Sequence, residues 1–242
     1  MCEPRLFCFS HERIEMSSQA SPIERQTLRV RLNTVSLEAD LSLPVAARGI
    51  VLFAHGSGSS RFSPRNREVA ERLNDAKLAT MLVDLLTSDE EAVDERTREL
   101  RFDIGLLADR LVGLTDWLRV HERTAALRIG YFGASTGAGA ALVAAAERPA
   151  TVDAVVSRGG RPDLAGAALA RVRAPTLLVV GGNDGPVIDM NWQALAALNC
   201  EKRLSLVPGA THLFEEPDAL GAVSVLARDW FKKYLEQPRS AK

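Results

Sequence analysis

The sequence predicts an α/β fold in which helices cover both faces of a mostly parallel central sheet. The first observation is a set of nearly continuous apolar runs, typical of strands buried on both sides, at residues 49–54, 79–85, 127–132, 154–157 and 176–180. The second is a set of segments with helical period between and after them, at residues 65–76, 102–121, 137–148, 187–198 and 218–235. Strands that alternate with helices through right-handed crossovers form such a sheet.

An antiparallel hairpin is expected ahead of this unit, at one edge of the sheet. Residues 28–43 alternate apolar and polar side chains, the pattern of half-buried strands, with a break near Asn33 and Thr34. Residues 87–101 are dense in charge, and we expect a solvated helix or loop face there rather than a binding surface. Residues 161–174, between two expected strands, are too few for a large cap domain, so we expect an open site.

The chain is expected to form one domain. Its 242 residues, 46% of them hydrophobic, suffice for a core with helices on both sides of a sheet. We assign residues 27–236 to this domain, residues 1–26 to a flexible N-terminal tail and residues 237–242 to a C-terminal tail. Met16 is an alternative start of the natural chain. Oligomeric state is not readable from the sequence, and a homo-oligomer is left open.

Charge and cysteine content limit the classes of partner. The 30 basic and 31 acidic residues give a net charge of -1, which offers no electrostatic reason to expect nucleic acid or a membrane surface as partner. The three cysteines, Cys2, Cys8 and Cys200, are an odd number, and two lie in the expected tail, so no disulfide framework is indicated. No export signal or membrane span is recognised, and we expect a cytoplasmic protein.

The clearest motif for chemistry is a turn between a buried strand and a helix. Residues 133–137 read Gly-Ala-Ser-Thr-Gly, with Ser135 at the centre of a G-x-S-x-G pattern. A serine on such a turn adopts a strained backbone and presents its hydroxyl to solvent, so Ser135 is a candidate nucleophile. Thr136 begins the helix, and its N–H is a candidate donor to an oxyanion. The alternative is a glycine-rich turn whose serine caps the helix or that binds phosphate.

A serine nucleophile needs a base, and His212 is the best-placed of four histidines. It lies in a turn after an expected strand at residues 204–207 and before the last helix. Asp184 follows the strand at 176–180, where a carboxylate would reach the same edge of the sheet and orient the imidazole. Its alternative is a turn aspartate, because Asn-Asp-Gly is itself a turn signal.

The order Ser135, Asp184, His212, each at the end of a successive strand, resembles that of the α/β-hydrolase superfamily, and the chain is similar to its dienelactone-hydrolase-like group. The resemblance runs from about residue 28 to the last helix and implies an α/β-hydrolase fold. Dienelactone hydrolases proper use a cysteine nucleophile, whereas this turn carries a serine. That departure favours general ester chemistry over lactone-specific chemistry.

The resemblance also implies an oxyanion loop at His55-Gly56-Ser57, with the Ser57 N–H as the second donor. We expect the His55 side chain to hold this loop rather than to transfer protons. Three arginines near the same edge, Arg61, Arg158 and Arg161, are candidates for binding a substrate carboxylate. Salt bridges to neighbouring acids are the open alternative.

The sequence therefore predicts a serine hydrolase that cleaves carboxylic esters of small acyl substrates through an acyl-enzyme. No metal or organic cofactor is expected, since no metal-spaced cluster and no nucleotide-binding motif occurs. The alternatives are a lactone or dienelactone hydrolase, a thioesterase, a peptidase, or a non-catalytic ligand-binding protein on the same fold.

Overall fold

A computed structural model describes residues 23–236. Residues 1–22 of the expected N-terminal tail, which we place at residues 1–26, and the expected C-terminal tail at residues 237–242 lie outside the described residues. Eight strands form one sheet in the order β1-β2-β4-β3-β5-β6-β7-β8. The strands are β1 (Ile23–Leu32), β2 (Val35–Pro44), β3 (Gly49–Ala54), β4 (Ala79–Val83), β5 (Arg128–Ala134), β6 (Val152–Arg158), β7 (Thr176–Gly181) and β8 (Lys202–Val207). The pairs from β4 to β8 are parallel, whereas β1 with β2 and β2 with β4 are antiparallel. The predicted mixed sheet with an edge hairpin is confirmed.

The hairpin begins earlier than the sequence indicated. β1 starts at Ile23, and residues 23–26 pair with residues 41–44 of β2. These four residues therefore belong to the domain and not to the tail to which we assigned them. Their pattern is obscured because β1 is an edge strand, on which Glu24 and Arg25 are solvent-exposed.

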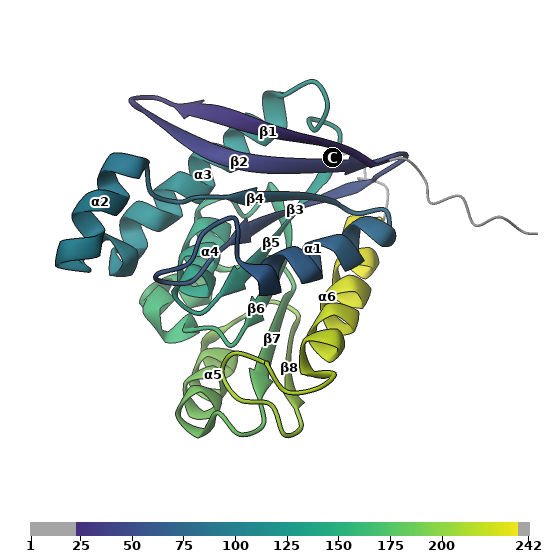
Figure 1. Cartoon of the computed structure of the whole chain (residues 1–242). Coiled ribbons are helices and arrows are strands. Elements are labelled where there is room, and N and C mark those ends of the chain that lie inside the picture. The colour runs from purple at the N-terminus through teal and green to yellow at the C-terminus, as the bar shows by residue number, and fades with distance from the viewer. Residues whose placement is uncertain (1–22, 237–242) are drawn as a thin grey trace, which may run out of the picture.

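Helices cover both faces of the sheet, as Figure 1 shows. On one face α1 (Pro64–Asp75) packs beside α6 (Ala219–Leu235), and on the other α3 (Ile104–Val120), α4 (Thr136–Glu147) and α5 (Gly185–Ala197) line up with the short turns of η2 (Pro162–Arg171). Two hydrophobic clusters, one on each side, form the core. The apolar strands are buried on both faces, as their continuous apolar runs predict.

The charged segment after β4 forms a helix at the periphery. It comprises α2 (Ser88–Thr97) and the turn η1 (Leu100–Phe102), and Asp94 is the buried residue of α2. Thr87 and Glu90 form a capping box that starts the helix. The described domain has no large cap, since β6 and β7 are joined by the turns of η2 alone.

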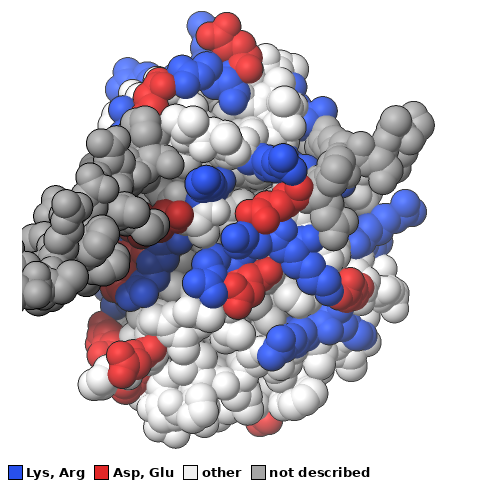
Figure 2. Space-filling model, turned by 90° about the vertical axis from the view of Figure 1, so that its right-hand side faces the viewer, with Lys and Arg blue, Asp and Glu red and all other residues white. Residues whose placement is uncertain are grey.

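Surface charge on the α1 and α6 side is mixed in sign. Figure 2 shows basic and acidic side chains interspersed over this face. Arg72 and Asp75 of α1 and Arg228 and Asp229 of α6 line one shallow hollow. None of the described helices is long and apolar enough to cross a membrane.

Candidate active site

Ser135 occupies a strained turn between β5 and α4. Its backbone has φ 49° and ψ -121°, a conformation that side-chain-bearing residues rarely adopt. The hydroxyl makes no capping hydrogen bond to α4, which argues against the alternative of a helix-capping serine. Gly137 permits the turn because a Cβ at that position would clash with the carbonyl oxygens of Ala54 and His55. The half-buried Ser135 side chain is thus left without a structural role of its own.

Asp184 and His212 form a direct pair. The Nδ1 of His212 lies 2.7 Å from Oδ2 of Asp184, and the aspartate side chain is 13% exposed. Asp184 precedes α5 but its carboxylate makes no capping hydrogen bond to that helix. The carboxylate is therefore available to hold the Nδ1–H tautomer of His212, which turns Nε2 into the acceptor.

Backbone contacts fix the two loops that carry this pair. The N–H of Asn183 donates to the carbonyl of Ala210 at 2.9 Å, and the Asn183 side chain donates to the carbonyl of Gly209. The His212 loop is closed from its other end by Glu216, which accepts from the N–H and the hydroxyl of Thr211. The His212–Asp184 distance is thus set by two rigid turns rather than by long side chains.

Ser135 and His212 line one cavity of about 240 Å³, here called the Ser135 cavity. Its wall comes from four parts of the chain that meet at the carboxyl edge of the sheet. The lining residues are Gly56, Ser57, Ser59, Ser63, Arg65, Asn66, Ala134, Ser135, Arg158, Gly159, His212 and Leu213. The structure therefore brings Ser135, His212, Ser57 and Arg158 together, with Asp184 behind His212.

The loop at residues 55–59 lies against Ser135. A Cβ on Gly56 would be 3.0 Å from Cβ of Ser135, so the backbone approaches the serine as closely as glycine allows. The N–H of Leu85 donates to Nε2 of His55, and Nδ1 of His55 lies 3.0 Å from the carbonyl of Gly56. Burial lowers the pKa of His55, so this ring is neutral and ties the loop to the end of β4.

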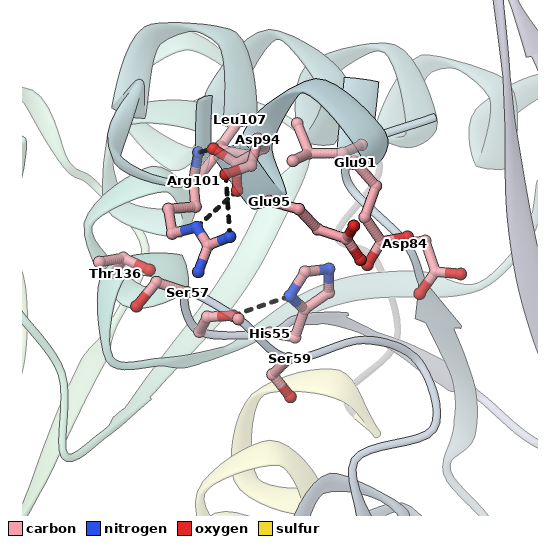
Figure 3. Close-up of a pocket in the computed structure, with 13 residues that line it drawn as sticks. His55, Ser57, Ser59, Asp84, Glu91, Asp94, Glu95, Arg101, Leu107 and Thr136 are labelled. Carbon is pink, nitrogen blue, oxygen red and sulfur yellow. Dashed lines mark hydrogen bonds and ion pairs between the residues drawn. The ribbon is translucent and has the colours of Figure 1, made fainter. Parts of the chain in front are cut away.

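A second cavity of about 240 Å³, here called the α2 cavity, shares Gly56, Ser57 and Ser59 of this loop with the Ser135 cavity and is also lined by residues of α2 (Figure 3). Ser57 lines both cavities, whereas Thr136, the other candidate oxyanion donor, lines the α2 cavity and is not among the residues that line the Ser135 cavity. Arg101 extends toward them and is held by Asp94, whose Oδ2 lies 2.5 Å from its Nε, while Glu91 and Glu95 stand opposite. The hydroxyl oxygen of Thr136 is buried without a hydrogen-bond partner among the described residues.

The three candidate arginines have different environments. Arg61 pairs with Asp84 and Asp40 and faces a groove away from Ser135. Arg161 makes a pair with Asp163, two residues on, and is not among the residues that line the Ser135 cavity. Arg158 does line that cavity and has no carboxylate partner among the described residues. Arg61 and Arg161 thus form salt bridges with neighbouring acids, which was the alternative to binding a substrate carboxylate.

The sequence predicted a helix at residues 65–76, but not that the first turn of this helix, α1, lines the Ser135 cavity. Ser63 caps this helix by accepting from the N–H of Asn66, and Pro64 stands at its first position. Ser63, Arg65 and Asn66 line the Ser135 cavity. The Ser-Pro start was readable, but not the direction in which the first turn faces, because that depends on the path of the loop after β3.

No group of three or more His, Cys, Asp or Glu side chains within residues 23–236 is arranged to hold a metal ion. Cys2 and Cys8 lie outside the described residues. Cys200 is a free, half-buried thiol whose pKa is raised by burial, far from the Ser135 turn in sequence.

The sheet order, the strained serine turn and the His–Asp pair on the loops after β8 and β7 are those of the α/β-hydrolase superfamily. The chain belongs to the dienelactone hydrolase family, whose model matches residues 37–237. It is similar to a dienelactone hydrolase from Anabaena variabilis ATCC 29413 of known crystal structure, at 64% identity over 88% of this chain and 99% of that chain, with a TM-score of 0.87. The predicted family and fold are confirmed.

Two further comparisons are more limited. Est1E from Butyrivibrio proteoclasticus shares the fold at a TM-score of 0.71, with 15% identity over 86% of this chain and 98% of that chain. A Mycobacterium tuberculosis (strain ATCC 25618 / H37Rv) protein, provisionally named a phosphoribosyl transferase, is 55% identical over 217 residues, which is 90% of this chain and 48% of that protein. The chain thus spans about half the length of this relative.

Proposed function

We propose that the protein hydrolyses carboxylic esters of small acyl substrates with Ser135 as nucleophile, His212 as general base and Asp184 as the group that orients His212. The observation that carries the proposal is the pairing of Asp184 with His212 Nδ1 at 2.7 Å beside a cavity that Ser135 also lines. Acyl transfer requires a serine hydroxyl that is not engaged in helix capping and a nearby histidine whose tautomer is fixed, so that the histidine can accept the serine proton.

In the first step Oγ of Ser135 forms a bond to the ester carbonyl carbon while Nε2 of His212 takes the hydroxyl proton. The carbonyl oxygen becomes an oxyanion, which the N–H groups of Ser57 and Thr136 bind. The bond to the alcohol then breaks, and His212 gives the proton to the leaving oxygen. Water repeats the sequence on the acyl-enzyme, which releases the acid and restores Ser135.

A lactone or dienelactone hydrolase is the alternative within this mechanism, because a lactone is a cyclic ester and the family includes dienelactone hydrolases. Thioesterase activity, peptidase activity and ligand binding without catalysis are less favoured alternatives. The name phosphoribosyl transferase belongs to a protein about twice as long as the matched segment. We propose hydrolase chemistry rather than phosphoribosyl transfer for this chain because the serine and the His–Asp pair serve acyl transfer.

The test is labelling by a fluorophosphonate together with turnover of phenyl acetate and of a simple lactone. The intact protein should label and hydrolyse the ester, and Ser135→Ala should do neither. Faster turnover of the lactone would favour the alternative. An intact, folded protein that neither labels nor turns over any ester would show that the serine is not a nucleophile.

A further inference from the structure

Arg158 is a buried cation without a counter-ion. Its residue is 7% exposed, it lines the Ser135 cavity, and its Nε is buried without a hydrogen-bond partner among the described residues. Other half-buried arginines of the described domain have carboxylate partners: Arg61 with Asp84, Arg101 with Asp94, and Arg110 with Glu90. Because a buried charge is costly unless it is paired, a group outside the described chain is expected to complete this site.

The contacts that Arg158 does make are weak. One Nη lies 3.5 Å from Oδ1 of Asn66, and the guanidinium carbon lies 5.9 Å from the centre of the Phe214 ring. Neither contact neutralises the charge, although the ring provides a face on which the guanidinium rests. Burial and the positive charge of Arg65 lower the pKa of Arg158 to about 10, which still leaves it protonated at neutral pH. A structural role for this arginine is therefore poorly supported.

The same wall of the cavity carries further positive charge. Arg65 lines it from the first turn of α1, and its Nη1 pairs with Glu215 at 2.7 Å while its Nε is buried without a partner among the described residues. α1 has 12 residues and no acidic side chain in its first turn, so the positive end of its dipole adds to this charge. Glu215 offsets one of the two guanidinium charges. The wall retains an excess of between one and two positive charges.

We propose that the Ser135 cavity takes an ester substrate that carries a phosphate group, bound by the guanidinium groups of Arg158 and Arg65. A phosphate monoester bears a charge of about -1.5 to -2 at neutral pH, close to the excess on this wall. Its three terminal oxygens can accept from several donors at once, and the fork of donors on a guanidinium group suits them. This inference names the substrate class of the proposed hydrolase and rests on that proposal.

Binding is tested with phenyl phosphate and benzoate on the Ser135→Ala protein at pH 7.5, by calorimetry. Phenyl phosphate should bind more tightly than benzoate, and Arg158→Met should weaken its binding by about tenfold or more. Arg158→Lys keeps the charge without the fork of donors and should bind with intermediate affinity. Arg148→Met is the matched control, because Arg148 pairs with Asp116 at the far end of α4. It should bind like the parent.

Inhibition provides the second measurement, in the protein with Ser135 intact. Phenyl phosphate should compete with phenyl acetate, and its inhibition constant should rise about tenfold or more in Arg158→Met and not in Arg148→Met. Thermal unfolding of each variant separates lost binding from lost folding. If Arg158→Met does not fold, Arg158→Lys and Arg65→Met carry the test.

The outcomes separate this inference from the proposed function. Ester turnover that depends on Ser135, without inhibition by phenyl phosphate, would overturn the phosphate site and leave the hydrolase. Binding of benzoate as tight as that of phenyl phosphate would overturn the choice of phosphate. Phosphate binding that depends on Arg158 in a protein without any ester turnover would overturn the hydrolase, and with it the reading of the phosphate as part of a substrate.

Discussion

The carboxylate of Asp184 lies 2.7 Å from Nδ1 of His212 instead of capping the helix that it precedes. An aspartate in an Asn-Asp-Gly turn at the start of a helix would ordinarily bond to backbone N–H groups. Here the backbone of residues 181–184 is held by the His212 loop, through the bond from Asn183 to Ala210, and the side chain is turned toward the imidazole. The Asp184 side chain therefore bonds to His212 rather than to the N-terminus of α5.

Replacement of Asp184 by asparagine should lower kcat for phenyl acetate by about 10³- to 10⁴-fold with little change in stability. An amide that donates to Nδ1 holds the imidazole in the tautomer that cannot accept the Ser135 proton at Nε2. Asp189→Asn, on the exposed side of α5, is the control and should retain full activity. A loss of less than tenfold in Asp184→Asn would show that Asp184 does not orient the base.

The strain in the backbone of Ser135 should be measurable as a difference in unfolding free energy between two variants at this position. Ser135→Ala removes the hydroxyl and keeps a Cβ at φ 49°, whereas Ser135→Gly also removes the Cβ that makes this conformation unfavourable. Strain of this kind costs about 1–3 kcal/mol, which exceeds the gain in unfolded-chain entropy from glycine of about 0.4–1 kcal/mol.

We therefore expect Ser135→Gly to be more stable than Ser135→Ala by about 1 kcal/mol in urea unfolding, and both to lack fluorophosphonate labelling. Equal stability of the two variants, or a more stable alanine variant, would mean that the turn stores no such strain.

The central strands were readable because each is buried on both faces. The run Gly49–Ala54 was predicted with the bounds that β3 has, since no polar residue interrupts it. β1 was not read in full because Glu24 and Arg25 face solvent on an edge strand and look like tail residues. The turns of η2 were also missed, since Gly166 breaks them and no helical period survives.

The candidate site was readable where backbone shape and chain order determine it. Ser135, Asp184 and His212 each follow a strand, and parallel strands bring their carboxyl ends to one edge. The pairing of the arginines was not predictable from the sequence. The partner of Arg61 is Asp84, 23 residues away and just after β4, and the isolation of Arg158 depends on which side chains the fold places around it. Charge pairing is a tertiary property.

Close packing at the serine turn makes Gly137 sensitive to the smallest side chain. A Cβ there would overlap the carbonyl oxygens of Ala54 and His55, which are backbone atoms of β3 and of the loop at residues 55–59 and cannot rotate away. Gly137→Ala should destabilise the protein by about 2 kcal/mol or more and reduce ester turnover, because the loop that carries Ser57 must move.

The control is Gly221→Ala in α6, where an added Cβ has no heavy atom within 4 Å. A helical alanine there should be neutral or stabilising by up to about 1 kcal/mol. Thermal unfolding and phenyl acetate turnover check both variants. Wild-type stability and activity in Gly137→Ala would contradict the close approach.

His55 should make stability fall at acidic pH. Burial lowers its pKa, and the carboxylates of Asp84 and Glu91 and the bond to Gly56 oppose this shift without cancelling it. In the unfolded chain a histidine binds its proton near pH 6.5. Below that pH the unfolded state binds more protons than the folded state. The contribution of His55 to the free energy of unfolding is therefore complete above about pH 6.5, and it is lost as the pH falls toward the lower pKa of His55 in the folded state.

Urea unfolding between pH 7.5 and 5 should therefore show a decline in unfolding free energy, with a contribution from His55 of at most about 1.4 kcal/mol per pH unit. In His55→Asn this part of the slope should disappear. The control is His121→Asn, because the His121 ring stacks on Trp117 near the end of α3. This variant should keep the part of the slope that comes from His55. Parallel profiles for the wild type and His55→Asn would mean that His55 is not held neutral between the oxyanion loop and the end of β4.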